Sequence, residues 1–262
     1  MINDFRFGTT WLSDVGCRLT IVPPVEIATR NVSLIDIPGR DGAECIDNGF
    51  YNNVEFTREI GFVNKLGEIA PENKVINWLA YLQGGYYEFE DTQHPDEITY
   101  AVLTNFGQIQ KQLQRIHKAT LQFSRHPYWY SKNGLIEQKY TTDEMIGGTV
   151  EILNPYNLNT KPIFCFRMKG SLNTKQQISF EIIVNGVKYS YVDVPYINVH
   201  SKIVLDCEKE QMYVTDDRDN IYKYVDISKV PQLLVGSNKI SIASDDSDNI
   251  DTISIIPRWR KL

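Results

Sequence analysis

The dipeptide Asn185-Gly186 is the feature that most constrains the fold of this chain. It joins two stretches, 177–184 and 187–194, that are rich in β-branched and aromatic residues. Both central residues of a tight type I′ turn need positive φ angles, which Asn and Gly adopt at low cost. The sequence therefore predicts a β-hairpin here, and with it an antiparallel sheet.

Further strand-like segments surround this hairpin at close spacing. A second hairpin is predicted from 202–207 and 211–215, which flank Glu208-Lys209-Glu210. Five more short strands are predicted at 149–153, 162–168, 221–225, 239–243 and 252–256. Many short strands separated by turn residues are typical of a β-sandwich, which we expect for this half of the chain.

Strands are also predicted in the first half. In the segment 51–63, alternate apolar residues share one face and polar residues share the other; the apolar ones are Val54, Phe56, Ile60 and Phe62. Arg58 interrupts the apolar face, so we expect it at a sheet edge or at an interface. Other strands are predicted at 17–22, 32–37, 86–90, 98–104 and 109–123.

A single short α-helix is predicted over residues 71–83. Pro71 suits the first turn of a helix, and apolar residues then recur at helical spacing until Gly84-Gly85 ends the pattern. Trp78 lies off the apolar stripe, so it either covers the sheet or contacts a neighbouring protein.

The composition changes near residue 130. Pro127 precedes three aromatic residues and then a polar, glycine-containing stretch, which is typical of a domain edge. A chain of 262 residues is long enough for two modest domains. We therefore expect a mainly β protein, with an N-terminal domain over 1–130 that contains the helix and a C-terminal β-sandwich over 131–250.

The last residues of the sequence are apolar and basic. The apolar segment 253–256 leads into Pro257-Arg258-Trp259-Arg260. An end of this composition is predicted to dock on a folded domain rather than to fray. Arg and Trp are also frequent anchors of interfaces, so Arg258, Trp259 and Arg260 are candidate interface residues.

The charge and hydropathy of the chain argue against several classes of partner. The formal net charge is −6, which does not suit a broad basic face for nucleic acid. No apolar run approaches the roughly 18 residues needed to span a bilayer. The start of the sequence lacks the basic and apolar regions of a secretory signal. We expect no sequence-specific nucleic-acid binding, no membrane insertion, and folding in the cytoplasm where the protein is made.

No segment predicts a catalytic, cofactor-binding or metal site, and we expect no enzyme. The four cysteines form no CxxC pair, and the four histidines have no partner at a catalytic or metal-ligand spacing. The acidic clusters 216–219 and 245–248 lack the glycine and the distal Glu of a calcium loop. The segment 37–42 lacks the spacing of a phosphate loop and predicts two tight turns that carry Arg40 and Asp41.

Aromatic residues gather at 86–87, at 128–130, and at Tyr189 and Tyr191. Aromatic residues on strands usually pack cores or support neighbours across a sheet. Exposed ones also stack on pyranose rings in sugar-binding sandwiches, so a carbohydrate-binding module is the alternative function. A glycan hydrolase would need two carboxylates in a cleft, and the sequence alone shows no such pair.

Motifs along most of the chain, taken in order, resemble those of the siphophage distal tail proteins, the hub components of a tailed-phage tip. They are the segments 5–8, 37–42 with the strand after it, the helix around Trp78, 121–127, 152–155, 161–163, 205–207, 234–238 and 257–260. The chain departs from this family at Arg125-His126, where a cysteine is common before the proline. It also has Asn154-Pro155-Tyr156 in place of the more usual Asn-Pro-Gly.

This resemblance implies an N-terminal domain that assembles into a homo-hexameric ring and a C-terminal galectin-like β-sandwich that projects outwards. The ring would lie between the tail-tube protein and the tail-associated protein, with a lumen for DNA. It would carry receptor-binding or baseplate proteins, and its outer domain could contact host glycans. The resemblance also implies that 251–262 complete the N-terminal domain. It places the protein at the tail tip of the virion, after synthesis in the host cytoplasm.

A closed ring needs two different patches on each subunit, because each subunit meets the next head to tail. Edge strands suit such contacts, since their unpaired backbone groups can pair with a neighbour. We expect the contact at the Arg40-Asp41 loop and along 48–58, which contains Arg58. Trp78 and residues 258–260 are the further interface candidates.

Overall fold

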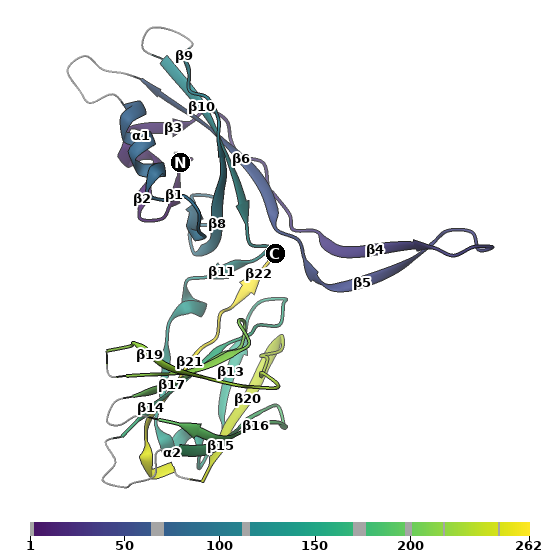
Figure 1. Ribbon diagram of the computed structural model, residues 1–262, viewed down its shortest axis with the longest axis vertical. Helices are drawn as coiled ribbons and strands as arrows, with labels where there is room; N and C mark the ends of the chain where they lie inside the picture. Colours follow the sequence, from purple (N-terminus) through teal and green to yellow (C-terminus); the bar gives the residue numbers. More distant parts are fainter. Residues whose placement is uncertain are drawn as a thin grey trace. The chain divides into compact units, whose positions relative to one another are not determined.

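The computed structural model describes residues 3–63, 71–111, 116–169, 177–196, 201–216, 218–245 and 247–262. The chain is mainly β, with antiparallel strands throughout, as the sequence predicts (Figure 1). It forms two compact units, one of residues 1–129 with Leu262 and one of residues 130–261. The sequence places the boundary near residue 130.

The first unit is built on one antiparallel sheet with the strand order β2-β1-β7-β8-β10-β6-β3, and β9 pairs with β10. A short 3-10 helix, Leu12–Val15, follows β2. The strands are β1 (Phe5–Phe7), β2 (Thr10–Trp11), β3 (Cys17–Leu19), β6 (Val54–Val63), β7 (Tyr87–Asp91), β8 (Glu97–Phe106), β9 (Gln110–Lys111) and β10 (Ile116–Arg125). The strand predicted at 109–123 is thus two strands, with residues 112–115 outside the described part.

Phe123 lies at the centre of an aromatic core in the first unit. Its ring centroid is between 5.1 and 6.1 Å from those of Phe5, Phe7, Phe56 and Phe89. The predicted apolar face of β6 is buried in this core, which confirms the alternation read from the sequence. An alternating strand can bury one face only if every second residue is apolar, which is the pattern of this segment.

Helix α1 (Pro71–Ala80) packs against the same core. It is three residues shorter than predicted. Trp78 is buried, and its indole Nε1 donates a hydrogen bond to the carbonyl of Phe7 at 3.1 Å. Of the two roles that the sequence left open for Trp78, this contact matches the first, in which it covers the sheet.

Strands β4 (Arg30–Asp36) and β5 (Ala43–Tyr51) form a separate two-stranded sheet. Figure 1 shows this hairpin extending away from the sheet of the first unit, and we call it the arm. The predicted strand 32–37 corresponds to β4, which begins two residues earlier and ends one residue earlier. The predicted strand 51–63 begins three residues later, at Val54, and strand β5 was not predicted.

The second unit contains two antiparallel sheets that share one core. One sheet has the order β12-β21-β14-β17-β18-β19, and the other has the order β13-β20-β15-β16. The strands are β12 (Gln138–Tyr140), β13 (Val150–Asn154), β14 (Ile163–Met168), β15 (Gln177–Val184), β16 (Val187–Pro195), β17 (Lys202–Asp206), β18 (Gln211–Thr215), β19 (Ile221–Val225), β20 (Gly236–Ser244) and β21 (Ile250–Ile256). This is the predicted β-sandwich architecture.

The hairpin predicted at Asn185-Gly186 joins β15 and β16, with Val184 paired to Val187. The φ angles of Asn185 and Gly186 are 52° and 83°, the left-handed values that this turn requires. One element was not predicted: a second short helix, α2 (Thr142–Met145), whose N-terminus is capped by reciprocal hydrogen bonds between Thr141 and Glu144.

The resemblance assigns 251–262 to the first domain, and most of this segment belongs to the second unit. Strand β21 lies inside the six-stranded sheet, and Ile253 and Ile255 are fully buried in the core of the second unit. Trp259 is buried in the same core, and only Leu262 belongs to the first unit. The alternating isoleucines explain the difference, because they supply an inner face for the sandwich. Two further short strands, β11 (Trp129–Ser131) and β22 (Arg260–Lys261), pair with each other.

Candidate assembly surface

The arm exposes nearly all of its side chains. Of the seven residues of β4 and the nine of β5, only Asn31 and Tyr51 are partly covered. Among the described residues, no third strand pairs with either. An isolated two-stranded hairpin is marginally stable in water, and its free edges are templates for pairing with another chain. The arm therefore has the features of a surface that is completed by a partner.

Apolar side chains lie on both faces of the arm. The register pairs Leu34 with Cys45 and Ser33 with Ile46, so Leu34 and Ile46 point to opposite faces. Leu34 is 69% exposed and Phe50 is 54% exposed. Burying one such side chain contributes about 1.5–3 kcal/mol. Several of them on one hairpin mark an interaction surface rather than scattered surface residues.

The tip of the arm carries Arg40 and Asp41, both exposed. Gly39 and Gly42 have φ angles of 84° and 82°, so each of the two turns predicted here contains a glycine in the left-handed region. The Arg40 guanidinium lies 3.7 Å from the Glu44 carboxylate, a pair that solvent largely screens. Both tip charges are therefore available to a partner.

Polar contacts join the two strands of the arm at its root. The guanidinium Nε of Arg30 donates to the Asp47 carboxylate at 2.9 Å, and this hydrogen bond lowers the pKa of Asp47. The Arg30 guanidinium also lies 4.8 Å from the centre of the Tyr51 ring. The backbone N–H of Asn52 donates to the carbonyl of Thr29 at 3.0 Å. These contacts fix the register where the arm leaves the first unit.

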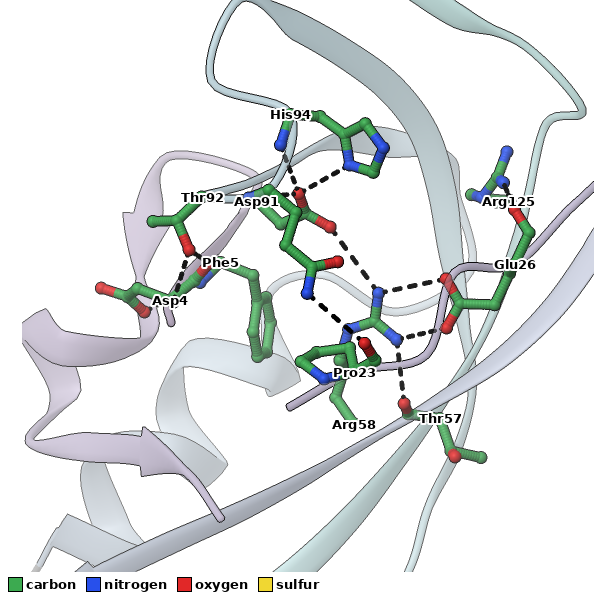
Figure 2. Close-up of polar contacts among 11 residues, drawn as sticks. Asp4, Phe5, Pro23, Glu26, Thr57, Arg58, Asp91, Thr92, His94 and Arg125 are labelled. Atoms are coloured by element: carbon green, nitrogen blue, oxygen red, sulfur yellow. Dashed lines mark hydrogen bonds and ion pairs between the residues drawn. The ribbon is translucent and has the colours of Figure 1, made fainter. Parts of the chain in front are cut away.

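A buried polar cluster lies beneath the segment that enters the arm (Figure 2). Arg58 is at its centre and is only 2% exposed. Its guanidinium Nη1 donates to the Glu26 carboxylate at 2.7 Å and to the Thr57 carbonyl at 3.0 Å. Its Nη2 lies 3.7 Å from the Asp91 carboxylate. Arg58 thus joins strand β6, the end of strand β7 and the segment that precedes the arm.

The sequence left a sheet edge or an interface open for Arg58, and the structure buries its side chain in the first unit. Arg58 pairs with Leu121 of β10, whereas β3 pairs with β6 only at 60–62, and the Arg58 side chain is buried. A buried guanidinium is tolerated here because Glu26 and Asp91 neutralise it and its apolar surroundings include the Phe56 ring, 4.5 Å away. Those carboxylates lie more than 30 residues from Arg58 in sequence, so no local sequence pattern predicts the contact.

Arg125 holds the same segment from strand β10. It is 1% exposed, and its Nη2 donates to the carbonyl of Glu26 at 2.9 Å. Its Nη1 donates to the carbonyl of His126 at 2.9 Å. Burial lowers the pKa of Arg125 to about 10, and the Glu26 charge opposes that shift. Arg125 therefore remains a cation that bonds to backbone carbonyls on both sides.

Asp91 completes the cluster, and its Oδ1 accepts three hydrogen bonds. The donors are the backbone N–H groups of Gln93 and His94 and the Nδ1 of His94, at 3.0, 2.9 and 2.8 Å. The His94 ring stacks on Trp129 at 4.2 Å. The cluster holds chain segments together, and its groups are engaged with one another rather than directed at an open site. It fixes the root of the arm.

The remaining interface candidates lie elsewhere, so the structure does not gather them into one site. In the second unit, the Arg258 guanidinium binds both oxygens of Asp206, at 2.6 and 3.0 Å. Arg260 Nη1 lies 3.2 Å from Oε1 of Glu208, and Trp259 is buried. The apolar residues of the arm were not predicted as an interface, because they lie on both faces and give no periodic apolar signal.

Among the described residues, no helix is long and apolar enough to cross a membrane. Within the same ranges, no group of three or more His, Cys, Asp or Glu side chains could hold a metal ion. The Asp216 carboxylate instead accepts hydrogen bonds from the backbone N–H groups of Arg218 and Asn220.

These features define a β protein of two units whose first unit carries an exposed hairpin arm. No family model matches the sequence, and no curated protein matches it. Among solved structures, the fold is similar to that of the SPP1 Dit protein, described as a paradigm of the hub adsorption apparatus in phages that infect Gram-positive bacteria. The TM-score is 0.64 over 100% of both chains, at 13% sequence identity.

A second structure, the mosquito-larvicidal Cry4Aa toxin from Bacillus thuringiensis, is much less similar. Its TM-score is 0.24 at 9% identity, over 98% of this chain and 52% of the toxin. The likeness to the Dit protein establishes a shared fold over the whole chain, as the resemblance in the sequence predicts.

Proposed function

We propose that this protein is a structural hub of a siphophage tail tip and that its first unit assembles into a ring of six copies. The observation that carries the proposal is the full-length fold likeness to the SPP1 Dit hub protein. The exposed arm supports it independently, because a hairpin with apolar side chains on both faces is stable only when something covers it.

The arm supplies one of the two patches that a closed ring requires. In a head-to-tail ring, the arm of each copy meets a different surface of the next copy. Its edges pair with a neighbouring strand, its apolar faces are covered, and Arg40 and Asp41 at the tip set the register by charge. Arg58 acts indirectly in this scheme, since it fixes the segment from which the arm begins.

The other parts of the proposal follow from the hub role. The ring lies between the tail-tube protein and the tail-associated protein, with a lumen through which DNA passes. The second unit is the galectin-like domain and provides the platform for receptor-binding or baseplate proteins. The protein is then a virion component at the tail tip, made in the host cytoplasm, and it has no enzymatic role.

Solution mass tests the ring. Six copies of the 30.2 kDa chain have a mass of about 181 kDa, which light scattering separates from a monomer, and negative-stain images should show a central hole. Leu34→Asp places a charge on the arm and is expected to give monomers. Leu153→Asp is the matched control, because Leu153 is 64% exposed in the second unit and Leu34 is 69% exposed.

Arg58→Glu is unsuitable for this test, since it would bury a third carboxylate beside Glu26 and Asp91 and unfold the first unit. A wild-type protein that stays monomeric at every concentration, or a Leu34→Asp variant that still forms rings, would contradict the proposed assembly through the arm.

A further inference from the structure

The six-stranded sheet of the second unit carries a continuous row of side chains across all of its strands. Directly paired residues point to the same side of a sheet. Their neighbours along each strand, such as Phe164, Ile203 and Met212, fill the core, so the row lies on the opposite, outer face. In strand order, the row consists of Lys139, Ser254, Cys165, Val204, Tyr213 and Tyr224.

One end of this row lies in a polar cavity of about 210 Å³. The cavity is lined by Glu137, Lys139, Cys165, Arg167, Lys202, Asp251, Thr252 and Ser254. All eight side chains carry a hydrogen-bond donor or acceptor, of which the Cys165 thiol is the weakest. Ser254 is buried, and its hydroxyl donates to Glu137 at 2.6 Å, which fixes that carboxylate at the cavity wall. A cavity with this lining suits a ligand that is rich in hydroxyl groups.

Arg167 is the free donor of the cavity. It is exposed, and its guanidinium makes no hydrogen bond or ion pair with any residue in the described part of the chain. A guanidinium offers five N–H donors in a fixed plane, which fits adjacent oxygen atoms of one ligand. The Lys202 ammonium is less available to a ligand, because its Nζ lies 2.5 Å from Oδ1 of Asp219.

The charges around the cavity balance, which favours an uncharged ligand. Three cations line it, and the Glu137 and Asp251 carboxylates line it with them. Asp219 neutralises one of the cations. With three positive and three negative groups, the cavity has no net charge to attract an anion. Its recognition must then rest on directed hydrogen bonds.

The other end of the row is aromatic. Tyr224 is 60% exposed, and its ring centroid lies 6.1 Å from that of Tyr213. Tyr222, two residues away on strand β19, is 67% exposed. Of the aromatic residues singled out from the sequence, Trp129, Tyr130 and Tyr191 are buried. Exposed tyrosine rings offer an apolar face on which the C–H face of a pyranose ring can stack.

The spacing between the two ends sets the size of the ligand. Cys165 in the cavity and Tyr224 are three strands apart, which is about 14 Å at the usual spacing of neighbouring strands. A single sugar ring is too short to contact both. We propose that this outer face binds a neutral oligosaccharide of at least two sugar units, with hydroxyl groups in the cavity and a ring stacked on Tyr224.

Binding of the full-length protein to an array of neutral and sialylated oligosaccharides tests this proposal. Titration calorimetry then compares the best neutral glycan with its own monosaccharide. Arg167→Ala and Tyr224→Ala are each expected to weaken binding by about tenfold, the effect of losing one directed contact. Arg40→Ala and Tyr81→Ala are the matched controls, because both side chains are exposed in the first unit. All four variants must keep the wild-type melting temperature.

Three results would overturn the proposal: no neutral glycan is bound, the monosaccharide binds as tightly as the oligosaccharide, or Arg167→Ala and Tyr224→Ala both bind like the wild type. Binding of sialylated glycans alone, lost at high salt, would also overturn it and identify an anion surface instead. The site does not depend on the ring. Failure of the glycan-binding proposal is therefore distinguishable from failure of the hub proposal, since the solution mass is measured on the same samples.

Discussion

At the scale of single residues, Arg58 shows how a buried charge can stabilise a fold through its partners. Replacing one member of a buried ion pair leaves the other charge uncompensated, at a cost of about 3–5 kcal/mol. Arg58→Leu is therefore expected to destabilise the first unit by that amount, because Glu26 and Asp91 lose their cation. Hydrogen exchange of the β6 and β10 amides reports this change specifically for the first unit.

Arg18→Leu is the control for this substitution. Arg18 is exposed on strand β3 of the same sheet, and surface substitutions of this kind usually change stability by less than about 0.5 kcal/mol. Equal protection of the β6 and β10 amides in the two variants would show that the Arg58 cluster contributes nothing to stability.

Asp206 gives the second unit an acid-sensitive contact. Burial acts to raise the pKa of this carboxylate, but the hydrogen bonds and charge of Arg258 outweigh it and the pKa is lowered. A carboxyl group with a lowered folded-state pKa contributes stability above its unfolded pKa, about 3.9, and loses it as the pH falls through the folded value. The second unit is therefore expected to lose stability below about pH 4.

Asp206→Asn removes that dependence, so the loss of stability between pH 7 and pH 3 should be smaller in the variant than in the wild type. Denaturant midpoints at the two pH values measure the difference. Asp226→Asn, an exposed carboxylate of the same unit, is expected to keep the wild-type loss. If Asp206→Asn and the wild type lose the same amount, the Arg258 pair is not the cause.

At the scale of elements, the arm offers its own probe, the exposed thiol of Cys45. Burial raises the pKa of Cys17 to about 12, and it also raises the pKa of Cys207, so these thiols react slowly. A maleimide should modify Cys45 first. If the ring forms through the arm, Cys45 is covered, and its labelling rate should fall by at least about tenfold in the ring fraction relative to the monomer.

The Leu34→Asp variant provides the comparison, since its Cys45 should stay reactive at concentrations where the wild type is protected. Leu34 and Cys45 are direct partners on one face of the arm, so one partner surface would cover both. Equal labelling in the ring and the monomer would place the subunit contact away from this face.

The sequence predicts those elements whose pattern is local. Asn185-Gly186 specifies its turn by backbone conformation, and β6 specifies its buried face by alternation. Strand β5 was missed because neither face packs against the core, so no periodic apolar signal exists. The burial of Arg58 was not predicted, because its partners, Glu26 and Asp91, are distant in sequence. The outer face of the six-stranded sheet was missed for the same reason, since its row draws on six separate strands.

At the scale of the whole molecule, the chain has two cores that share no residues. The core of the second unit includes Trp259 and side chains from both sheets of the sandwich, and the core of the first unit includes α1 and its aromatic cluster. A region with its own core and about 130 residues is within the size range of independently folding domains. The arm belongs to the first unit alone, so the proposed ring contact and the proposed glycan-binding face lie in different units.

This division predicts that a fragment of residues 130–262 folds by itself, because nearly all of its buried apolar surface is internal to it. Of the four tryptophans in the chain, the fragment contains Trp259 alone, so one fluorescence signal reports its core. Cooperative urea unfolding of that signal is expected, together with a monomeric mass, since the arm is absent. A fragment without a cooperative transition would mean that the first unit is needed to complete the sandwich. A folded fragment that forms rings would move the assembly surface from the arm to the second unit.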